Sequence, residues 1–410
     1  MERSITATIR LISIAGRASI IFIAALLLSP EEYANYVLIA AASALTTIFI
    51  GLDYTRLCQP IIFMEDKQGE KKTLNRLFNF THISSLTFFV LTLIFSLFTP
   101  TGRFDTYSIV IFIFLTLSDY YAQEATRVLV ILNKQRQSAN TLVIRSVTPP
   151  LILLPIALLP HEIATTNLSF TTILSISICC NSIAAIYGWK VLFGSNKPEI
   201  RTQTLPRFSA NDANNILFFF LATCISKAIT TLDKYYIELG YGSQQLATYA
   251  LTASAALLIV PIIDITIGSY AGARFLSVIE NTNQLRKRVL NAQSQSLMLA
   301  LLFTTIAPLV FSHLSIRLFP SYNIRHDIHT YLIFLCFSLY ACSTIPNIFF
   351  VCTKKPRALF FSTLGPLLPF SIWLLFSTPS YTNFLVGASL TMTLSLILKL
   401  LFCLALNFRK

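Results

Sequence analysis

Residues 26–56, LLLSPEEYANYVLIAAASALTTIFIGLDYTR, join a long apolar run to charged residues near its end. A helix that crosses a bilayer needs about 20 mostly apolar residues, and the run beginning at Tyr36 is long enough. Asp53 and Arg56 follow three residues apart, which places them on one helix face. A charge at bilayer depth costs at least about 2.5–3.5 kcal/mol. We interpret the stretch as a membrane span whose charges serve a function, usually a water-filled path for a polar passenger.

Similar apolar runs recur through all 410 residues, of which 54% are hydrophobic and 12% charged. A soluble chain would carry about twice that charged fraction. The runs lack strand alternation, and backbone amides must be paired within lipid, so each run predicts a helix. The first run has basic flanks like a signal peptide, but it continues into further spans and is interpreted as a retained helix. The sequence therefore predicts an all-α polytopic membrane protein with about twelve transmembrane helices, at Leu11–Leu28, Tyr36–Phe63, Leu77–Thr99, Tyr107–Leu132, Asn140–Leu159, Phe170–Phe193, Ala213–Leu239, Leu246–Gly268, Ser296–Ser315, Thr330–Val351, Leu359–Ser377 and Asn383–Leu406.

Basic residues divide unequally between the two sets of loops that these spans define. One set holds 21 Lys and Arg, in residues 3–10, 67–76, 134–136, 190–207, 274–288, 354–357 and 409–410. The opposite set holds only Arg103, Arg317 and Arg325. Loops rich in Lys and Arg stay in the cytoplasm. We therefore expect both termini to be cytoplasmic, in a bacterial inner membrane. The net charge of +13 is explained by topology, not by nucleic acid.

The second and eighth predicted spans resemble each other. Ala34, Tyr36, Leu38, Ala40, Ala42 and Leu45 match Ala247, Tyr249, Leu251, Ala253, Ala255 and Leu258 at one constant offset. An offset of six helices predicts two parallel six-helix lobes around a central cavity, with the passenger path between them. We expect residues 1–196 to form the N-terminal lobe, residues 197–211 the cytoplasmic linker and residues 212–410 the C-terminal lobe.

Charged residues within the predicted spans are the candidate site. Arg forms planar, bidentate contacts with phosphate oxygens, so a cationic cavity open to the cytoplasm would suit a pyrophosphate head group. Carboxylates at bilayer depth are candidates for binding a coupling ion. The substrate-binding candidates are Arg17, Arg56, Arg127, Arg145 and Lys227. The coupling-ion candidates are Asp119, Glu124, Asp233 and Asp264.

A structural role is the alternative for most of these residues. Asp53–Arg56 and Glu124–Arg127 have the spacing of intrahelical ion pairs. Arg145 and Lys399 could extend their side chains to the inner membrane surface, and Lys234 could be interfacial. Arg17 has no anionic partner nearby in the sequence, which makes it the leading single candidate.

Several classes of chemistry have no motif in the sequence. The eight cysteines are scattered without a CxxC pair, and the five histidines show no metal-ligand spacing. Walker A, GxGxxG and GxSxG motifs are not found. We therefore expect no cofactor and no transport driven by ATP through this chain alone.

Two quoted stretches, residues 26–56 above and residues 231–258, TLDKYYIELGYGSQQLATYALTASAALL, resemble polysaccharide exporters of the multidrug/oligosaccharidyl-lipid/polysaccharide (MOP) superfamily. The likeness is nearest to the O-antigen (Wzx-type) flippases. It implies translocation of an undecaprenyl-pyrophosphate-linked oligosaccharide across the bacterial inner membrane. Cationic residues of early helices line the cavity in that family, and Arg17 and Arg56 fall at comparable places. Asp233–Lys234 fits the family's acidic-basic pair in the seventh helix.

Two alternative functions remain open at this point. An O-antigen polymerase would have similar length and hydrophobicity, but polymerases usually carry a large periplasmic loop that this sequence lacks. A cation-coupled multidrug exporter of the same fold would favour a negatively charged cavity, whereas the first lobe counts four cations against three anions. A flippase further implies a polysaccharide polymerase and a chain-length regulator as partners, besides the lipid-linked oligosaccharide and inner-membrane lipid, and no nucleic acid.

Overall fold

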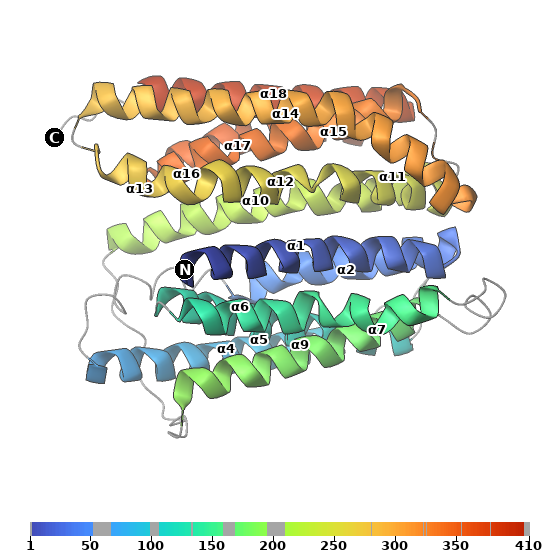
Figure 1. Cartoon of the computed structure of the whole chain (residues 1–410), viewed down its shortest axis with the longest axis horizontal. Coiled ribbons are helices and arrows are strands. Elements are labelled where there is room, and N and C mark those ends of the chain that lie inside the picture. The colour runs from blue at the N-terminus through green and yellow to red at the C-terminus, as the bar shows by residue number, and fades with distance from the viewer. Residues whose placement is uncertain are drawn as a thin grey trace. The chain divides into compact units, whose positions relative to one another are not determined.

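The computed structural model describes residues 2–51, 67–98, 106–132, 134–158, 169–194, 210–279, 281–322, 324, 326–353, 355–377 and 379–405. Within these ranges the regular structure is entirely helical (Figure 1). The chain divides into two compact units, Met1–Arg207 and Phe208–Lys410. All twelve predicted spans coincide with a helix or a run of short helices in the described ranges, which confirms the all-α class.

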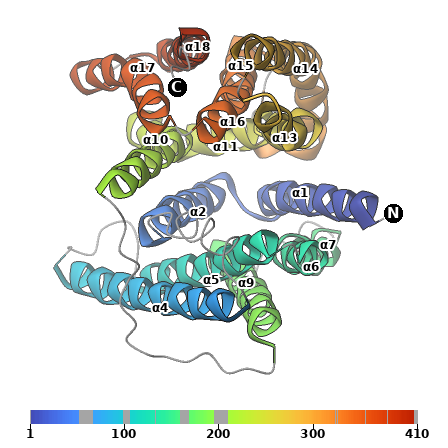
Figure 2. The same ribbon diagram turned by 90° about the vertical axis from the view of Figure 1, so that its left-hand side faces the viewer.

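The first unit is organised around α5 (Thr106–Ile131), which contacts four other helices of the unit (Figure 2). Its tightest neighbour is α9 (Phe170–Phe193), where small residues let the backbones approach. A Cβ on Gly188 would lie 2.7 Å from the Cβ of Ala125. The other helices of this unit are α1 (Glu2–Leu27), α2 (Pro30–Gly51), α4 (Lys67–Phe98), α6 (Gln135–Ser146) and α7 (Thr148–Ala157).

The second unit packs α15 (Ile328–Cys342) and α18 (Tyr381–Ala405) against each other at its centre. Aromatic residues fill its core, including the fully buried Phe334, Phe349 and Phe350. Its other elements are α10 (Ala210–Tyr241), α11 (Ser243–Ala256), α12 (Ile259–Ile263), the π-helix η1 (Asp264–Gly268), α13 (Ser269–Leu276), α14 (Thr282–Leu318), the 3-10 turn η2 (Pro320–Tyr322), α16 (Thr344–Cys352) and α17 (Pro356–Phe376).

Three predicted spans are broken where the sequence analysis expected continuous helices. Asn140–Leu159 is divided between α6 and α7, Leu246–Gly268 between α11, α12 and η1, and Thr330–Val351 between α15 and α16. Prolines lie at or just after each break, at positions 149, 150, 261 and 346. Proline has no backbone N–H, so the carbonyl four residues earlier loses its helical partner and the helix bends or stops.

Nine helical segments among the described residues are long and apolar enough to cross a membrane, and Ile12–Leu27 is a shorter apolar helix. Large apolar side chains such as Leu86, Leu301 and Leu375 are exposed. Contiguous apolar surface on this scale is unfavourable in water and favourable in lipid. The chain is therefore a multi-pass membrane protein. Helices α5 and α10 are long enough to span, but they carry several of the ionisable candidate residues.

Candidate functional site

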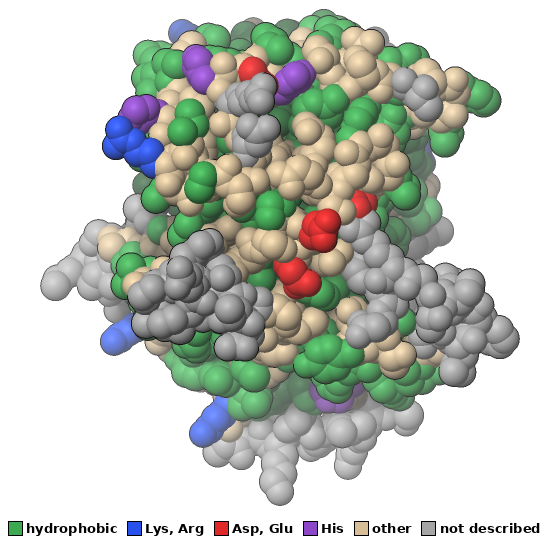
Figure 3. Space-filling model, turned by 90° about the vertical axis from the view of Figure 1, so that its right-hand side faces the viewer, with side chains coloured by type: hydrophobic (Ala, Val, Ile, Leu, Met, Phe, Trp, Pro, Cys, Tyr) green, Lys and Arg blue, Asp and Glu red, His purple; other side chains and the backbone are tan. Residues whose placement is uncertain are grey.

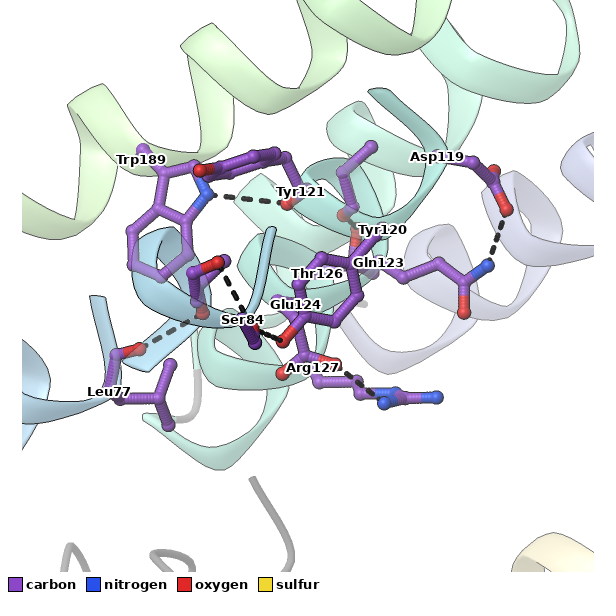
Figure 4. A network of polar contacts seen from close by, with 12 residues as sticks. Leu77, Ser84, Asp119, Tyr120, Tyr121, Gln123, Glu124, Thr126, Arg127 and Trp189 are labelled. Atoms are coloured by element: carbon purple, nitrogen blue, oxygen red, sulfur yellow. Dashed lines mark hydrogen bonds and ion pairs between the residues drawn. The ribbon is translucent and has the colours of Figure 1, made fainter. Parts of the chain in front are cut away.

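The centre of the candidate site is an ion pair between Asp119 on α5 and Arg145 on α6. Arg145 Nη2 donates to Asp119 Oδ1, and the two side chains are 16% (Asp119) and 11% (Arg145) exposed. One turn further along α5, Gln123 Nε2 donates to the second oxygen, Asp119 Oδ2, at 2.6 Å (Figure 4). Both carboxylate oxygens are therefore bonded, and the carboxylate is held in one orientation by two helices.

Arg17 reaches the same place from α1. Its Nε donates to Ser146 Oγ at 3.2 Å, and its charge interacts with both Arg145 and Asp119. Helix α1 comes this close because residue 16 is glycine: a Cβ there would lie 2.5 Å from the carbonyl oxygen of Ser146. Ser146 is the last residue of α6, and Pro150 removes the amide that would normally bond its carbonyl.

This group, which we call the guanidinium cluster, contains Arg17, Asp119, Gln123, Arg145 and Ser146. Two guanidinium groups and one carboxylate give it a net charge of +1, counted from its members. Arg145 is largely buried and bonded to Asp119, whereas Arg17 is exposed. A planar guanidinium is suited to bind phosphate oxygens. The cluster can therefore accept an anion without removing a buried carboxylate from its partner.

Glu124 and Arg127 form a separate pair further along α5. Arg127 Nη1 donates to Glu124 Oε1 at 2.6 Å (Figure 4). The Glu124 side chain is 3% exposed, whereas that of Arg127 is 44% exposed. Helix α2 packs against both groups: a Cβ on Gly51 would lie 3.0 Å from the Tyr120 ring and 3.8 Å from Glu124 Oε1. The intrahelical pair considered as an alternative is thus present.

The charged candidates of the second unit lie mainly on α10. Tyr249 of α11 donates from its hydroxyl to Asp233 Oδ2 at 2.5 Å, and Lys234 Nζ lies 3.3 Å from Asp233 Oδ1. Lys227 is half-buried on the same helix. Asp264 begins the π-helical segment and is exposed, and its Oδ1 would lie 2.7 Å from a Cβ on Gly268.

The structure shows the surroundings of the three basic residues for which a position at the membrane surface was the alternative. Lys399 does not extend to the membrane surface, since it is 3% exposed and lies within the second unit. Lys234 is 12% exposed, and its Nζ is paired with Asp233 Oδ1. Arg145 likewise pairs with Asp119 in place of extending outward. Arg56 and its expected partner Asp53 lie outside the described residues.

Three contributing residues were not found from the sequence: Gln123, Ser146 and Tyr249. Gln123 is four residues after Asp119, a helical spacing that could have indicated the contact. Ser146 precedes the Pro149–Pro150 pair, which marks a helix break. Nothing in the sequence pairs Tyr249 with Asp233. Within the described ranges, no group of three or more His, Cys, Asp and Glu side chains is placed to hold a metal ion.

Solved structures of membrane transporters have a fold similar to that of this chain. An inward-facing multidrug-resistance MATE transporter of the MOP superfamily superposes with a TM-score of 0.60 at 13% identity, covering 97% of both chains. A MOP-superfamily transporter from Pyrococcus furiosus gives 0.63 at 14% identity, covering 97% of this chain and 93% of the other. The lipid II flippase MurJ gives 0.64 at 13% identity, covering 98% and 86% respectively.

The class of protein is thus a multi-pass, all-helical membrane protein whose two halves each supply a bundle of helices. More particularly, the chain has the fold of the MOP-superfamily transporters, over nearly its whole length. No protein-family model matches the sequence. No curated protein matches it either.

Proposed function

We propose that this protein flips an undecaprenyl-pyrophosphate-linked O-antigen or polysaccharide repeat unit from the cytoplasmic to the periplasmic leaflet of the bacterial inner membrane. It is a transporter and not an enzyme. Its substrate and lipid are the direct partners, and a polysaccharide polymerase and a chain-length regulator act on the flipped product. The observation that carries the proposal is the guanidinium cluster, in which Arg17 is exposed beside a compensated Asp119–Arg145 pair.

The chemistry of this cluster favours a phosphate-bearing passenger. Arg145 neutralises Asp119, so the charge of Arg17 remains uncompensated within the cluster. A pyrophosphate carries several acceptor oxygens at fixed spacing, which match the fork of N–H donors on a guanidinium. Each charge-assisted hydrogen bond contributes about 1.5–3 kcal/mol. The lipid II flippase MurJ has a similar fold, so this architecture is compatible with a lipid-linked substrate.

Replacement of Arg17 tests the proposal directly. In proteoliposomes containing a fluorescent undecaprenyl-pyrophosphate oligosaccharide, Arg17→Ala should lower the flipping rate at least about tenfold, the equivalent of about 1.4 kcal/mol. Arg17→Lys should restore only part of the rate, because a single ammonium cannot form the two-point contact. The matched control is Arg136→Ala, since Arg136 is an exposed arginine of α6 outside the cluster. Equal flipping by Arg17→Ala and wild type would contradict the proposal.

Multidrug export is the second candidate, because MATE transporters share the fold to a similar degree. A cationic drug would need uncompensated carboxylates, whereas the guanidinium cluster has net positive charge. Efflux of a cationic dye from cells expressing the protein should therefore equal the background of cells lacking it. Efflux that is lost in Asp119→Asn, together with unchanged surface polysaccharide, would favour the exporter.

A further inference from the structure

The second unit contains a cavity of about 510 Å³ that no pattern in the sequence indicated. The end of α10, the start of α11, Ile324 and the starts of α15 and α18 surround it. The loop-charge asymmetry places all of these helix ends on the extracytoplasmic side. Its volume lies within the range of about 300–1,000 Å³ that is typical of small-molecule sites. Thr252, Thr330 and Ile333 are buried in its lining.

Aromatic rings form a continuous part of the cavity wall. The ring centroids of Tyr241 and Tyr381 lie 5.4 Å apart in an edge-to-face arrangement. The ring of His329 follows, 5.2 Å from that of Tyr381. Tyr241 is fixed by the hydrogen bond from its hydroxyl to the carbonyl of Pro379, at 2.6 Å. Tyrosine offers an apolar ring face together with a polar tip, which suits ligands that have both characters.

Uncharged polar groups supply much of the remaining wall. Gln244 Nε2 donates to the carbonyl of Ser321 at 3.0 Å, and Gln245 forms a hydrogen bond with Tyr381. Thr248 Oγ1 donates to the carbonyl of Tyr322 at 2.6 Å. Side-chain amides present both donors and acceptors, and hydroxyl groups can act as either. The contacts already formed hold these side chains in place before any ligand arrives.

The carboxylate in the lining is already used by the protein. Asp327 caps α15: its Oδ1 accepts from the Thr330 amide at 3.1 Å, and its Oδ2 lies 3.0 Å from His329 Nδ1. His329 Nε2 in turn lies 2.8 Å from Thr382 Oγ1. Lys and Arg do not occur among the described residues that line the cavity. The described lining therefore offers no basic side chain to an anion, and its one carboxylate has both oxygens bonded.

We infer that this cavity binds an uncharged sugar residue of the passenger at the extracytoplasmic end of the second unit. Tyr241 and Tyr381 would pack against the C–H-bearing face of a pyranose ring. The amides of Gln244 and Gln245 would exchange hydrogen bonds with its hydroxyl groups, and Thr248 Oγ1 would accept one. Histidine side chains lie around an acidic one in the upper part of this face (Figure 3). The inference rests on the proposed function, because it assigns the glycan part of the proposed substrate a site of its own.

Binding of soluble sugars to the full-length protein in lipid nanodiscs provides the test. Saturation-transfer NMR would be recorded with N-acetylglucosamine and galactose as neutral probes, glucosamine as a cation and glucuronate as an anion. We expect signals from at least one neutral sugar that exceed those from both charged probes. Tyr381→Ala and Gln245→Leu should each weaken that binding about tenfold, equivalent to about 1.4 kcal/mol. Tyr381→Phe, which keeps the ring, should bind better than Tyr381→Ala.

Tyr331→Ala is the matched control, because Tyr331 belongs to α15 at the same end of the unit but does not line the cavity. It should bind the neutral sugar like wild type. The inference is overturned if no neutral sugar binds, if a charged probe binds best, or if the cavity variants bind like the control.

Arg17→Ala should leave soluble-sugar binding intact, since these probes carry no pyrophosphate. Wild-type protein that flips the lipid-linked oligosaccharide without binding sugar would leave the proposed function standing while removing this site. Protein that binds sugar without flipping would do the reverse.

Discussion

The two carboxylates of α5, Asp119 and Glu124, are each paired with an arginine. A carboxylate within a membrane span is costly when alone, but Arg145 and Gln123 bond both oxygens of Asp119. Removing one member of such a pair leaves an uncompensated buried charge, which is far more harmful than removing both. The same reasoning applies to Glu124, which is 3% exposed and bonded to Arg127. Ion pairing therefore explains both carboxylates of α5 structurally. A role in ion coupling needs an experiment that distinguishes it from this pairing.

A double-variant experiment separates pairing from ion coupling at Glu124. Glu124→Gln alone should reduce flipping, because Arg127 would lose its counter-charge. Adding Arg127→Gln should recover much of the activity, since no uncompensated charge remains. The measurement is the flipping rate in proteoliposomes, with and without an imposed proton or sodium gradient. A double variant that remains inactive and a wild type that depends on the gradient would instead assign Glu124 to coupling.

These residues also show how far the sequence could define the site. The cost of a charge in lipid identified Arg17, Asp119 and Arg145 individually as candidates. The i,i+3 and i,i+4 rules find partners only within one helix, as for Glu124 and Arg127. Asp119 and Arg145 are 26 residues apart on different helices, so their contact depends on how α5 packs against α6. Such packing depends on the shapes of side chains, and the spacing of residues along one helix does not predict it.

At the scale of elements, hydropathy predicted where helices lie but not where they break. A proline in a membrane helix is tolerated when neighbouring groups bond the freed carbonyl, so its presence alone does not predict a break. In α17, Pro366 leaves the Ser362 carbonyl without its usual amide, and Ser395 Oγ donates to it at 3.2 Å. That helix stays continuous, whereas the Pro149–Pro150 pair coincides with the division between α6 and α7.

The close approach of α1 to the end of α6 predicts a specific intolerance at Gly16. Gly16→Ala should lower the thermal unfolding temperature, because the new Cβ would lie 2.5 Å from a backbone oxygen that cannot rotate away. Overpacking of this kind costs about 1–3 kcal/mol. Gly365→Ala is the matched control: its Cβ would lie 3.8 Å from Leu398, an ordinary contact, and alanine is the better helix former by about 1 kcal/mol. A Gly16→Ala protein as stable as the Gly365→Ala protein would refute the close contact.

The cap of α15 predicts a pH-dependent contribution to stability. Burial raises the pKa of Asp327, but hydrogen bonds from the Thr330 amide and from His329 outweigh it, and the pKa lies below the ordinary value of 3.8. A carboxyl whose pKa is lower in the folded state stabilises the protein above its unfolded pKa, and the effect disappears as pH falls through the folded value. Asp327→Ala should therefore cost about 1 kcal/mol at neutral pH.

Thermal unfolding of purified protein at several pH values measures this contribution. The difference between wild type and Asp327→Ala should narrow once the pH falls below 3.8, the ordinary aspartate value. Asp327→Asn keeps a capping oxygen without a titrating group, so it should remain close to wild type at neutral pH. A stability difference between wild type and Asp327→Ala that is constant across the acidic range would contradict an ionised cap.

At the scale of the whole molecule, matching residues of the internal repeat are buried in both units. Ala34 and Leu38 of α2 are buried, and so are their matches Ala247 and Leu251 of α11. Small and medium apolar residues recur at these places because helices pack closely there, and lipid-facing positions are free to vary. The repeat predicts that both units run in the same direction through the membrane, which requires an even number of spans in each.

Reporter fusions test that orientation. The basic residues gather in loops on one side, 21 against three, so both termini and the 197–207 segment should be cytoplasmic. A periplasm-active phosphatase fused after Lys410, or inserted within residues 197–207, should therefore be inactive. The same phosphatase inserted in the 319–328 loop should be active, and a cytoplasm-active reporter at each position should give the opposite pattern.

An active phosphatase after Lys410 in a protein that still supports surface polysaccharide would require an odd number of spans. It would also move the sugar cavity to the cytoplasmic side, where it would meet the glycan before translocation and not after it.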